Sequence, residues 1–216
     1  MCHGPNCGDD NGLRDESSPR SLLHYLELIR SFMEADPNAI ITIIFQDGVP
    51  LSEADLVWQQ FLDAGLEDLY FDPAGTDWNV EAENGWPLMQ WMVDNNKRLI
   101  VFTSKTNHPH FPYQWQYTVE NDFGSVDFNS CPRRGNSSPL DDMSKHLFVM
   151  NHFRSFLLGV NTYEDNNYNA LIRKVDDHCR LAAERYPNFL AVDFVEQGLN
   201  GGVLKVVNEL NMRDDW

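Results

Sequence analysis

The 216-residue chain has few basic residues: 16 Lys and Arg stand against 33 Asp and Glu, which gives a formal net charge of −17. Proteins bind nucleic acid through clustered Lys and Arg, so this charge argues against a nucleic-acid partner. It also argues against electrostatic attachment to anionic lipid. An anionic substrate would therefore need a local positive site set against the overall negative field.

The sequence also lacks long apolar runs and several familiar motifs. No run approaches the roughly 20 residues of a membrane-spanning helix, and the first residues, MCHGP, do not have the pattern of a signal peptide. GxSxG, GxGxxG and P-loop patterns are missing, so serine-nucleophile, dinucleotide and nucleotide-phosphate chemistry have no support. The sequence contains no CxxC pair, so it gives no indication of a structural zinc site. The four cysteines fit either disulfides in an oxidising compartment or ordinary cytosolic thiols. They are Cys2, Cys7, Cys131 and Cys179.

Hydrophobic patterning predicts strands that alternate with helices. Runs of β-branched and aromatic residues predict strands over 40–45, 69–71, 98–103, 146–150 and 189–194. Three of these runs are almost continuously apolar, which is typical of strands buried on both faces of a parallel sheet. Helical spacing predicts helices over 19–35, 52–64, 87–95, 165–185 and 201–211. The alternation predicts a parallel α/β fold, and the length fits one domain over residues 1–216.

The segment 104–145 departs from this alternation because it is rich in Pro, Asn, Ser and Gly. We expect a long functional loop there, since it directly follows a predicted strand. Five strands do not close an eight-stranded barrel, which typically needs about 250 residues. The chain is therefore expected to form an incomplete barrel that lacks the first two or three βα units.

Polar side chains follow the predicted strands, and the carboxyl ends of parallel strands share one edge of the sheet. The candidates placed in this way, with one at the amino terminus, are His3, Gln46, Asp47, Lys105, Asn151 and Asp193. Asp193 is expected inside a core strand, where a carboxylate needs a partner histidine or cation. Asp47 also fits simple turn chemistry, and His3 fits a solvated terminal residue.

Two further patterns have competing interpretations. The sequence His108-Pro109-His110 fits a metal site or a mobile loop, and the missing carboxylate motif favours the loop. Trp115 and Tyr117 alternate with glutamines, which fits either a covered strand or a wall on which a sugar ring stacks.

Several motifs, in order, resemble the X-domain of phosphatidylinositol-specific phospholipase C, in particular the small phospholipase C-like phosphodiesterases of plants, fungi and bacteria. The resemblance covers nearly the whole chain. It rests on CHG at 2–4, DPNAIITI at 36–43, KRLIVF at 97–102, YQWQYTVEN at 113–121 and RYPNFLAVDF at 185–194. The fold that it implies is an incomplete or distorted TIM barrel.

The resemblance implies cleavage of an inositol phospholipid by two histidines. One histidine is the general base on the inositol 2-hydroxyl, and the other, which His3 matches, is the general acid to the leaving diacylglycerol oxygen. Asp193 matches an aspartate that orients or charges a histidine, and Glu120 and Asn151 sit at family-typical positions. The family's base lies before the CHG motif, so a fragment or a decayed relative is expected. The alternatives to an enzyme of this kind are a catalytically silent inositol-phosphate or lipid-binding relative and a glycerophosphodiester phosphodiesterase.

The resemblance also bears on metal, cysteines and partners. Gln46 stands where many members have a glutamate that binds Ca²⁺, so the expectation is no cofactor, or Ca²⁺ at Asp47. Cys2–Cys7 and Cys131–Cys179 are the implied disulfides, and they suggest an extracellular location. A lipid substrate implies peripheral membrane contact, for which 111–113 is the expected apolar rim. The oligomeric state is not readable from the sequence.

Overall fold

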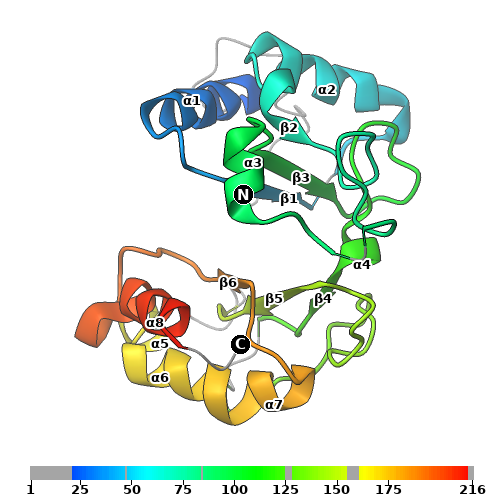
Figure 1. Ribbon diagram of the computed structural model, residues 1–216. Helices are drawn as coiled ribbons and strands as arrows, with labels where there is room; N and C mark the ends of the chain where they lie inside the picture. The colour runs from blue at the N-terminus through cyan, green and yellow to red at the C-terminus, as the bar shows by residue number, and fades with distance from the viewer. Residues whose placement is uncertain (1–20, 47, 84, 125–127, 155–160, 214–216) are drawn as a thin grey trace. The chain divides into compact units, whose positions relative to one another are not determined.

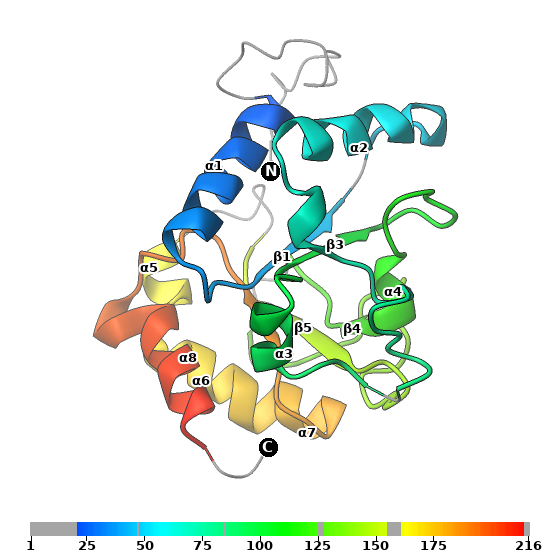
Figure 2. The same cartoon turned by 45° about the horizontal axis from the view of Figure 1, so that its top comes forward.

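The computed structural model describes residues 21–46, 48–83, 85–124, 128–154 and 161–213. The chain divides into two compact units, which we call unit 1 (Met1–Gln114) and unit 2 (Trp115–Trp216). Each unit has its own parallel sheet (Figures 1 and 2), and each has its own hydrophobic core. In the described residues, no helix is long and apolar enough to cross a membrane.

Unit 1 contains a three-stranded parallel sheet with the order β1-β3-β2. The strands are β1 (Ile41–Phe45), β2 (Tyr70–Phe71) and β3 (Leu99–Thr103). The central strand β3 pairs Leu99 with Ile41 on one side and with Tyr70 on the other. The connecting helices are α1 (Leu22–Ala35), η1 (Leu51–Glu53), α2 (Ala54–Asp63), η2 (Glu67–Leu69) and α3 (Met89–Asp94).

Helix α1 shows how the sequence sets the limits of an element. Ser21 caps its first turn, with its Oγ accepting a hydrogen bond from the His24 amide at 3.2 Å. Leu26 and Met33, seven residues apart on one face, are buried. The helix ends at Ala35 because Asp36 precedes a proline, and that position disfavours helical backbone.

The core of unit 1 lies between α1, α2 and one face of the sheet. Side chains at alternate strand positions point into it, as the two-residue period of a strand requires. Its members include Leu26, Met33, Val57, Phe61, Leu99, Val101 and Phe111. On the other strand positions, Phe71 and Phe102 contact Trp86, and Phe71 also contacts Trp91 of α3. The central strand β3 is therefore buried on both faces, as its apolar run predicted, whereas β1 is half-buried.

Unit 2 contains a second parallel sheet with the order β4-β5-β6. The strands are β4 (Thr118–Glu120), β5 (Leu147–Asn151) and β6 (Phe189–Ala191). The helices are α4 (Gln114–Tyr117), which crosses the unit boundary, then α5 (Thr162–Asp165), α6 (Tyr168–Arg173), the π-helical turn η4 (Lys174–Cys179), α7 (Arg180–Ala183), η5 (Leu199–Gly201) and α8 (Gly202–Asn211).

The core of unit 2 joins this sheet to the continuous helix α6–η4–α7 and to α8 (Figure 2). Its buried members include Val119, Phe148, Met150, Leu171, Val175, Val203, Val206 and Leu210. A disulfide links Cys131 to Cys179, with their Cα atoms 5.1 Å apart, which is the pairing that the resemblance implied. Cys2 and Cys7 lie outside the described residues. The disulfide fixes the loop after β4 to the end of the π-helical turn.

The parallel α/β class and all five predicted strands are confirmed, but three details differ. The segment 104–145 is not one loop, because it contains α4 and the sixth strand β4. The helix predicted over 165–185 is interrupted at Asn166, and Asn167 caps a new helix by accepting from the Asn169 amide at 2.8 Å. The strands of the described residues form two separate open sheets rather than the single sheet of an incomplete barrel.

Candidate active site

Two neighbouring strands of unit 2 end in polar residues that bind one another. Glu120 is the last residue of β4 and Asn151 the last of β5, and both are buried. Asn151 Nδ2 donates to Glu120 Oε1 at 2.6 Å. A buried carboxylate without a hydrogen-bond partner would destabilise the fold, so this contact allows Glu120 to be buried at the end of β4. The structure thus brings together two of the residues that the sequence singled out.

Asn121 extends this network one residue beyond the sheet. Its Oδ1 accepts from the Asn151 amide at 2.7 Å, and its Nδ2 donates to the Asn151 carbonyl at 3.1 Å. In return, Asn151 Nδ2 donates to the Asn121 carbonyl at 2.8 Å. These reciprocal amide bonds hold the carboxyl ends of β4 and β5 at a fixed separation, so the groups around them are rigidly placed.

Two cations complete the network. Arg134 Nη1 lies 2.9 Å from Glu120 Oε1, in an ion pair whose side chains are 20% and 5% exposed. Lys174, at the start of the π-helical turn, is buried and donates through Nζ to the Asn151 carbonyl at 2.8 Å. A π-helical turn shifts the direction of the side chains that follow it and often occurs at functional sites. The two cations, Arg134 and Lys174, are balanced by the carboxylates of Glu120 and Asp122, so this strand edge is less acidic than the chain as a whole.

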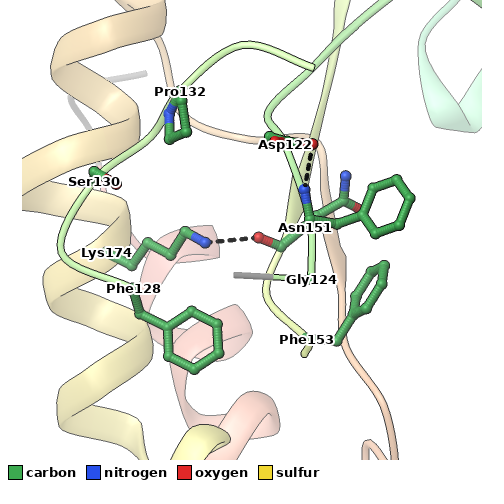
Figure 3. A pocket seen from close by; sticks show the side chains of 9 residues that line it. Asp122, Gly124, Phe128, Ser130, Pro132, Asn151, Phe153 and Lys174 are labelled. Atoms are coloured by element: carbon green, nitrogen blue, oxygen red, sulfur yellow. Dashed lines mark hydrogen bonds between the residues drawn. The ribbon is translucent and has the colours of Figure 1, made fainter. Parts of the chain in front are cut away.

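A recess opens beside these residues, and Figure 3 shows Lys174 reaching across it toward Asn151. Phe128 and Phe153 line its apolar part. Its polar lining includes Asp122, Ser130, Asn151 and Lys174. With a volume of about 10 Å³, the recess has room for a single water molecule and is too small to be a ligand pocket by itself.

His152 follows Asn151 and is fully buried. Its Nε2 lies 2.6 Å from the Asp165 carbonyl and donates to it, while Nδ1 has no hydrogen-bond partner among the described residues. The ring stacks on Phe128 with centroids 4.0 Å apart. Burial lowers the pKa of His152 to about 4, and the positive charges of Lys174 and Arg154 lower the same pKa. His152 is therefore neutral near pH 7.

Asp193 lies elsewhere than the sequence predicted. The strand β6 ends at Ala191, and Asp193 is exposed in the bend that follows. Ala191 pairs with Asn151, which is the last residue of β5. The residues after Ala191 therefore have no strand to pair with. Asp193 is fixed through its backbone instead, because its carbonyl accepts from Asn166 Nδ2 at 2.7 Å. The expectation of a carboxylate inside a core strand was wrong.

The remaining predicted residues fall into two groups. Gln46 and Lys105 belong to unit 1 and follow β1 and β3, whose last residues, Phe45 and Thr103, pair with each other. Trp115 and Tyr117 are only 8% and 4% exposed, so little surface is left for a sugar ring, and the covered alternative is correct, although the segment is a short helix rather than a strand. His3 and Asp47 lie outside the described residues.

Asn121, Arg134 and Lys174 belong to this network but were not among the site residues predicted from the sequence. Asn121 directly follows the strand residue Glu120, so the rule of polar residues at strand ends would have found it once β4 was recognised. Arg134 and Lys174 carry no such local signal. Arg134 reaches the site from a loop and Lys174 from a helix that lies 23 residues after Asn151.

The described residues do not fit a Ca²⁺ site. No three of their His, Cys, Asp or Glu side chains gather in a way that could hold a metal ion. Gln46 offers only a neutral oxygen, and Glu120 is already bound by Arg134 and Asn151. We therefore assign no step to calcium.

The family model and the similar proteins all indicate one family, and they cover most of the chain. The family model described as PI-PLC X 1 matches residues 1–211. A PI-PLC X domain-containing protein of Arabidopsis thaliana is 33% identical over 196 residues, which cover 88% of this chain and 44% of that protein. PI-PLC X domain-containing protein 1 of Arthroderma benhamiae is 26% identical over 228 residues, which cover 98% of this chain and 68% of that protein. No solved structure matches.

This chain thus spans less than half the length of the Arabidopsis relative. The family model, in contrast, matches nearly every residue of the chain, from the CHG motif to helix α8. The chain belongs to the PI-PLC X domain family.

Proposed function

We propose that this protein is a phosphoric diester hydrolase of the phospholipase C type that cleaves an inositol phospholipid. The observation that carries the proposal is the family match over residues 1–211, which includes the His3 motif. The site in unit 2 supports it, because buried polar groups and two cations gather at the carboxyl ends of parallel strands, where α/β enzymes place their chemistry.

The chemistry follows from the properties of imidazole. The inositol 2-hydroxyl gives its proton to a base, which is water where no histidine of this sequence matches the family's base, and its oxygen attacks the adjacent phosphorus. The bond to the diacylglycerol oxygen breaks, and His3 gives that oxygen a proton. Imidazole titrates near neutral pH, so a protonated histidine is available to donate. A cation offsets the negative charge that grows on the phosphate, and Lys105, which follows β3, is a candidate for this role.

A lipid substrate requires contact with a membrane surface. The expected rim at 111–113 does not supply it, because Phe111 is buried in the core of unit 1. Phe194 and Val195 are 56% and 51% exposed and directly follow Asp193. Asn166 Nδ2 fixes this turn by donating to the carbonyls of Asp193 and Phe194. Exposed apolar side chains held in a rigid turn suit insertion into the interface, which does not depend on charge.

The test is analysis of the products released from phosphatidylinositol vesicles. The proposal predicts diacylglycerol and a water-soluble inositol phosphate, and it predicts that Phe194→Ser lowers turnover on vesicles but not on a soluble short-chain substrate. Release of glycerol phosphate from a glycerophosphodiester, with no diacylglycerol from vesicles, would favour the glycerophosphodiesterase alternative. Binding of inositol phosphate without either product would indicate a silent binding relative.

A further inference from the structure

The loop that carries Arg134 is held against the end of β4 by several independent contacts. Asn121 and Arg133 form an antiparallel bridge. The Asp122 amide donates to the Pro132 carbonyl at 2.7 Å, and the Arg134 amide donates to the Glu120 carbonyl at 3.0 Å. The disulfide at Cys131 anchors the start of the same segment. The backbone of Arg134 is therefore fixed relative to the strand.

The guanidinium of Arg134 is fixed as well. Nη1 is bound to Glu120 Oε1 at 2.9 Å. The guanidinium carbon lies 5.1 Å from the centre of the Trp115 ring and 4.7 Å from that of Phe123, which are cation–π distances. A carboxylate and two aromatic rings thus hold a side chain that in solution samples many rotamers.

The hydrogen bond to Glu120 uses only one nitrogen of the guanidinium group, Nη1. In the part of the chain that the structure describes, Glu120 is the one hydrogen-bond partner of the Arg134 side chain, and that side chain is 20% exposed. Nε and Nη2 are therefore left to bind something else. A planar fork of N–H donors matches the paired oxygens of a phosphoryl group, and a fork already held in place loses little entropy on binding.

The neighbouring arginine provides a contrast. Arg133 donates through Nη1 to the Ser137 carbonyl at 2.6 Å, a bond within its own loop. This bond gives Arg133 a structural role in holding its own loop. The two arginines have the same charge and adjacent positions, so they form a natural pair for an experiment.

We propose that Arg134, held by Glu120 between Trp115 and Phe123, binds the phosphoryl group of a phosphate ester through its remaining N–H donors. The identity of the ester as an inositol phosphate rests on the proposed function. The anion-binding role of Arg134 does not.

The experiment titrates the full chain with inositol 1-phosphate and with inorganic phosphate, and it follows the arginine Nε–H signals by NMR and the heat of binding by calorimetry. We expect saturable binding of inositol 1-phosphate and a shift of the Arg134 signal. Arg134→Lys keeps the charge and loses the fork, so it should weaken binding at least tenfold, whereas Arg133→Lys should change it less than twofold. Unchanged binding by Arg134→Lys, or a wild-type Arg134 signal that does not move, would overturn the proposal.

Two further outcomes separate the claims. Saturable binding of inorganic phosphate but not of inositol 1-phosphate would overturn the ester assignment. If Arg134 binds inositol 1-phosphate as described and the chain cleaves no phospholipid, the proposed function fails and the role of Arg134 stands. If Arg134→Lys does not fold, as judged by circular dichroism, the wild-type NMR titration alone still decides the question.

Discussion

Lowering the pH from 7 to 5 should destabilise unit 2 by about 2 kcal/mol through a single buried side chain, His152. The pKa of this histidine is about 4 in the folded protein, against about 6.5 for an unperturbed histidine. The unfolded chain therefore binds the proton more readily than the folded chain. Stability is at its full value above pH 6.5, falls as the pH drops from 6.5 to 4, and is lower below pH 4 by a total of about 3.4 kcal/mol.

The structure explains the size of this effect. The ring of His152 is buried, its Nδ1 has no hydrogen-bond partner among the described residues, and Lys174 and Arg154 both disfavour a further positive charge. The only opposing contributions are the hydrogen bond to the Asp165 carbonyl and the charge of Asp165. A proton on Nδ1 would thus sit in a buried environment that is already cationic.

The assay is urea unfolding at pH 5, 6 and 7, with hydrogen exchange at 147–153 to report on unit 2 separately. His152→Gln keeps a donor for the Asp165 carbonyl and cannot titrate, so its stability should be nearly constant over this range. His146→Gln, at a half-buried position just before β5, is the matched control and should keep the wild-type slope. A His152→Gln slope equal to that of the wild type would refute the reasoning.

Three further predictions concern stability. Glu120→Ala leaves Arg134 without its carboxylate and should cost about 3–5 kcal/mol in urea unfolding; a loss below about 1 kcal/mol would show that the pair is not important for the fold. Replacing Cys131 and Cys179 together by serine opens a loop with a sequence separation of 48 and should cost about 4 kcal/mol, and equal unfolding midpoints for the variant and the oxidised wild type would contradict this. Arg98 is buried and donates to three carbonyls at the end of α1 and in the turn that follows. Its replacement by Met should lower the free energy of unfolding by about 2–3 kcal/mol, measured by thermal unfolding, and an unchanged melting temperature would contradict this.

The sequence predicted the strands that are buried on both faces, because a continuous apolar run leaves little alternative. Leu99–Thr103 and Leu147–Asn151 are of this kind, whereas Ile41–Phe45 has the same apolar pattern but is only half-buried. The strand β4 was missed because it has only three residues, one of them the carboxylate Glu120. Its stability comes from pairing with β5 and from the polar network at its end, which a local pattern does not reveal.

The candidate site was predictable only in part, for a related reason. Asn151 could be found because strand ends converge, whereas Glu120 was indicated only by the family resemblance. Arg134 and Lys174 could not, since their positions depend on a disulfide and on a π-helical turn that join segments distant in sequence. Asp193 was misplaced because its apolar neighbours continue the strand pattern, whereas the strand itself stops where its partner β5 stops.

The central claim, that this chain cleaves an inositol phospholipid with His3 as the acid, is tested most directly by the rate of inositol phosphate release from phosphatidylinositol vesicles. The account predicts measurable turnover by the wild-type chain and a rate at least about 100-fold lower for His3→Ala, the smaller end of the range for loss of a general acid. Background release by the wild type, or equal rates for the two proteins, would contradict it.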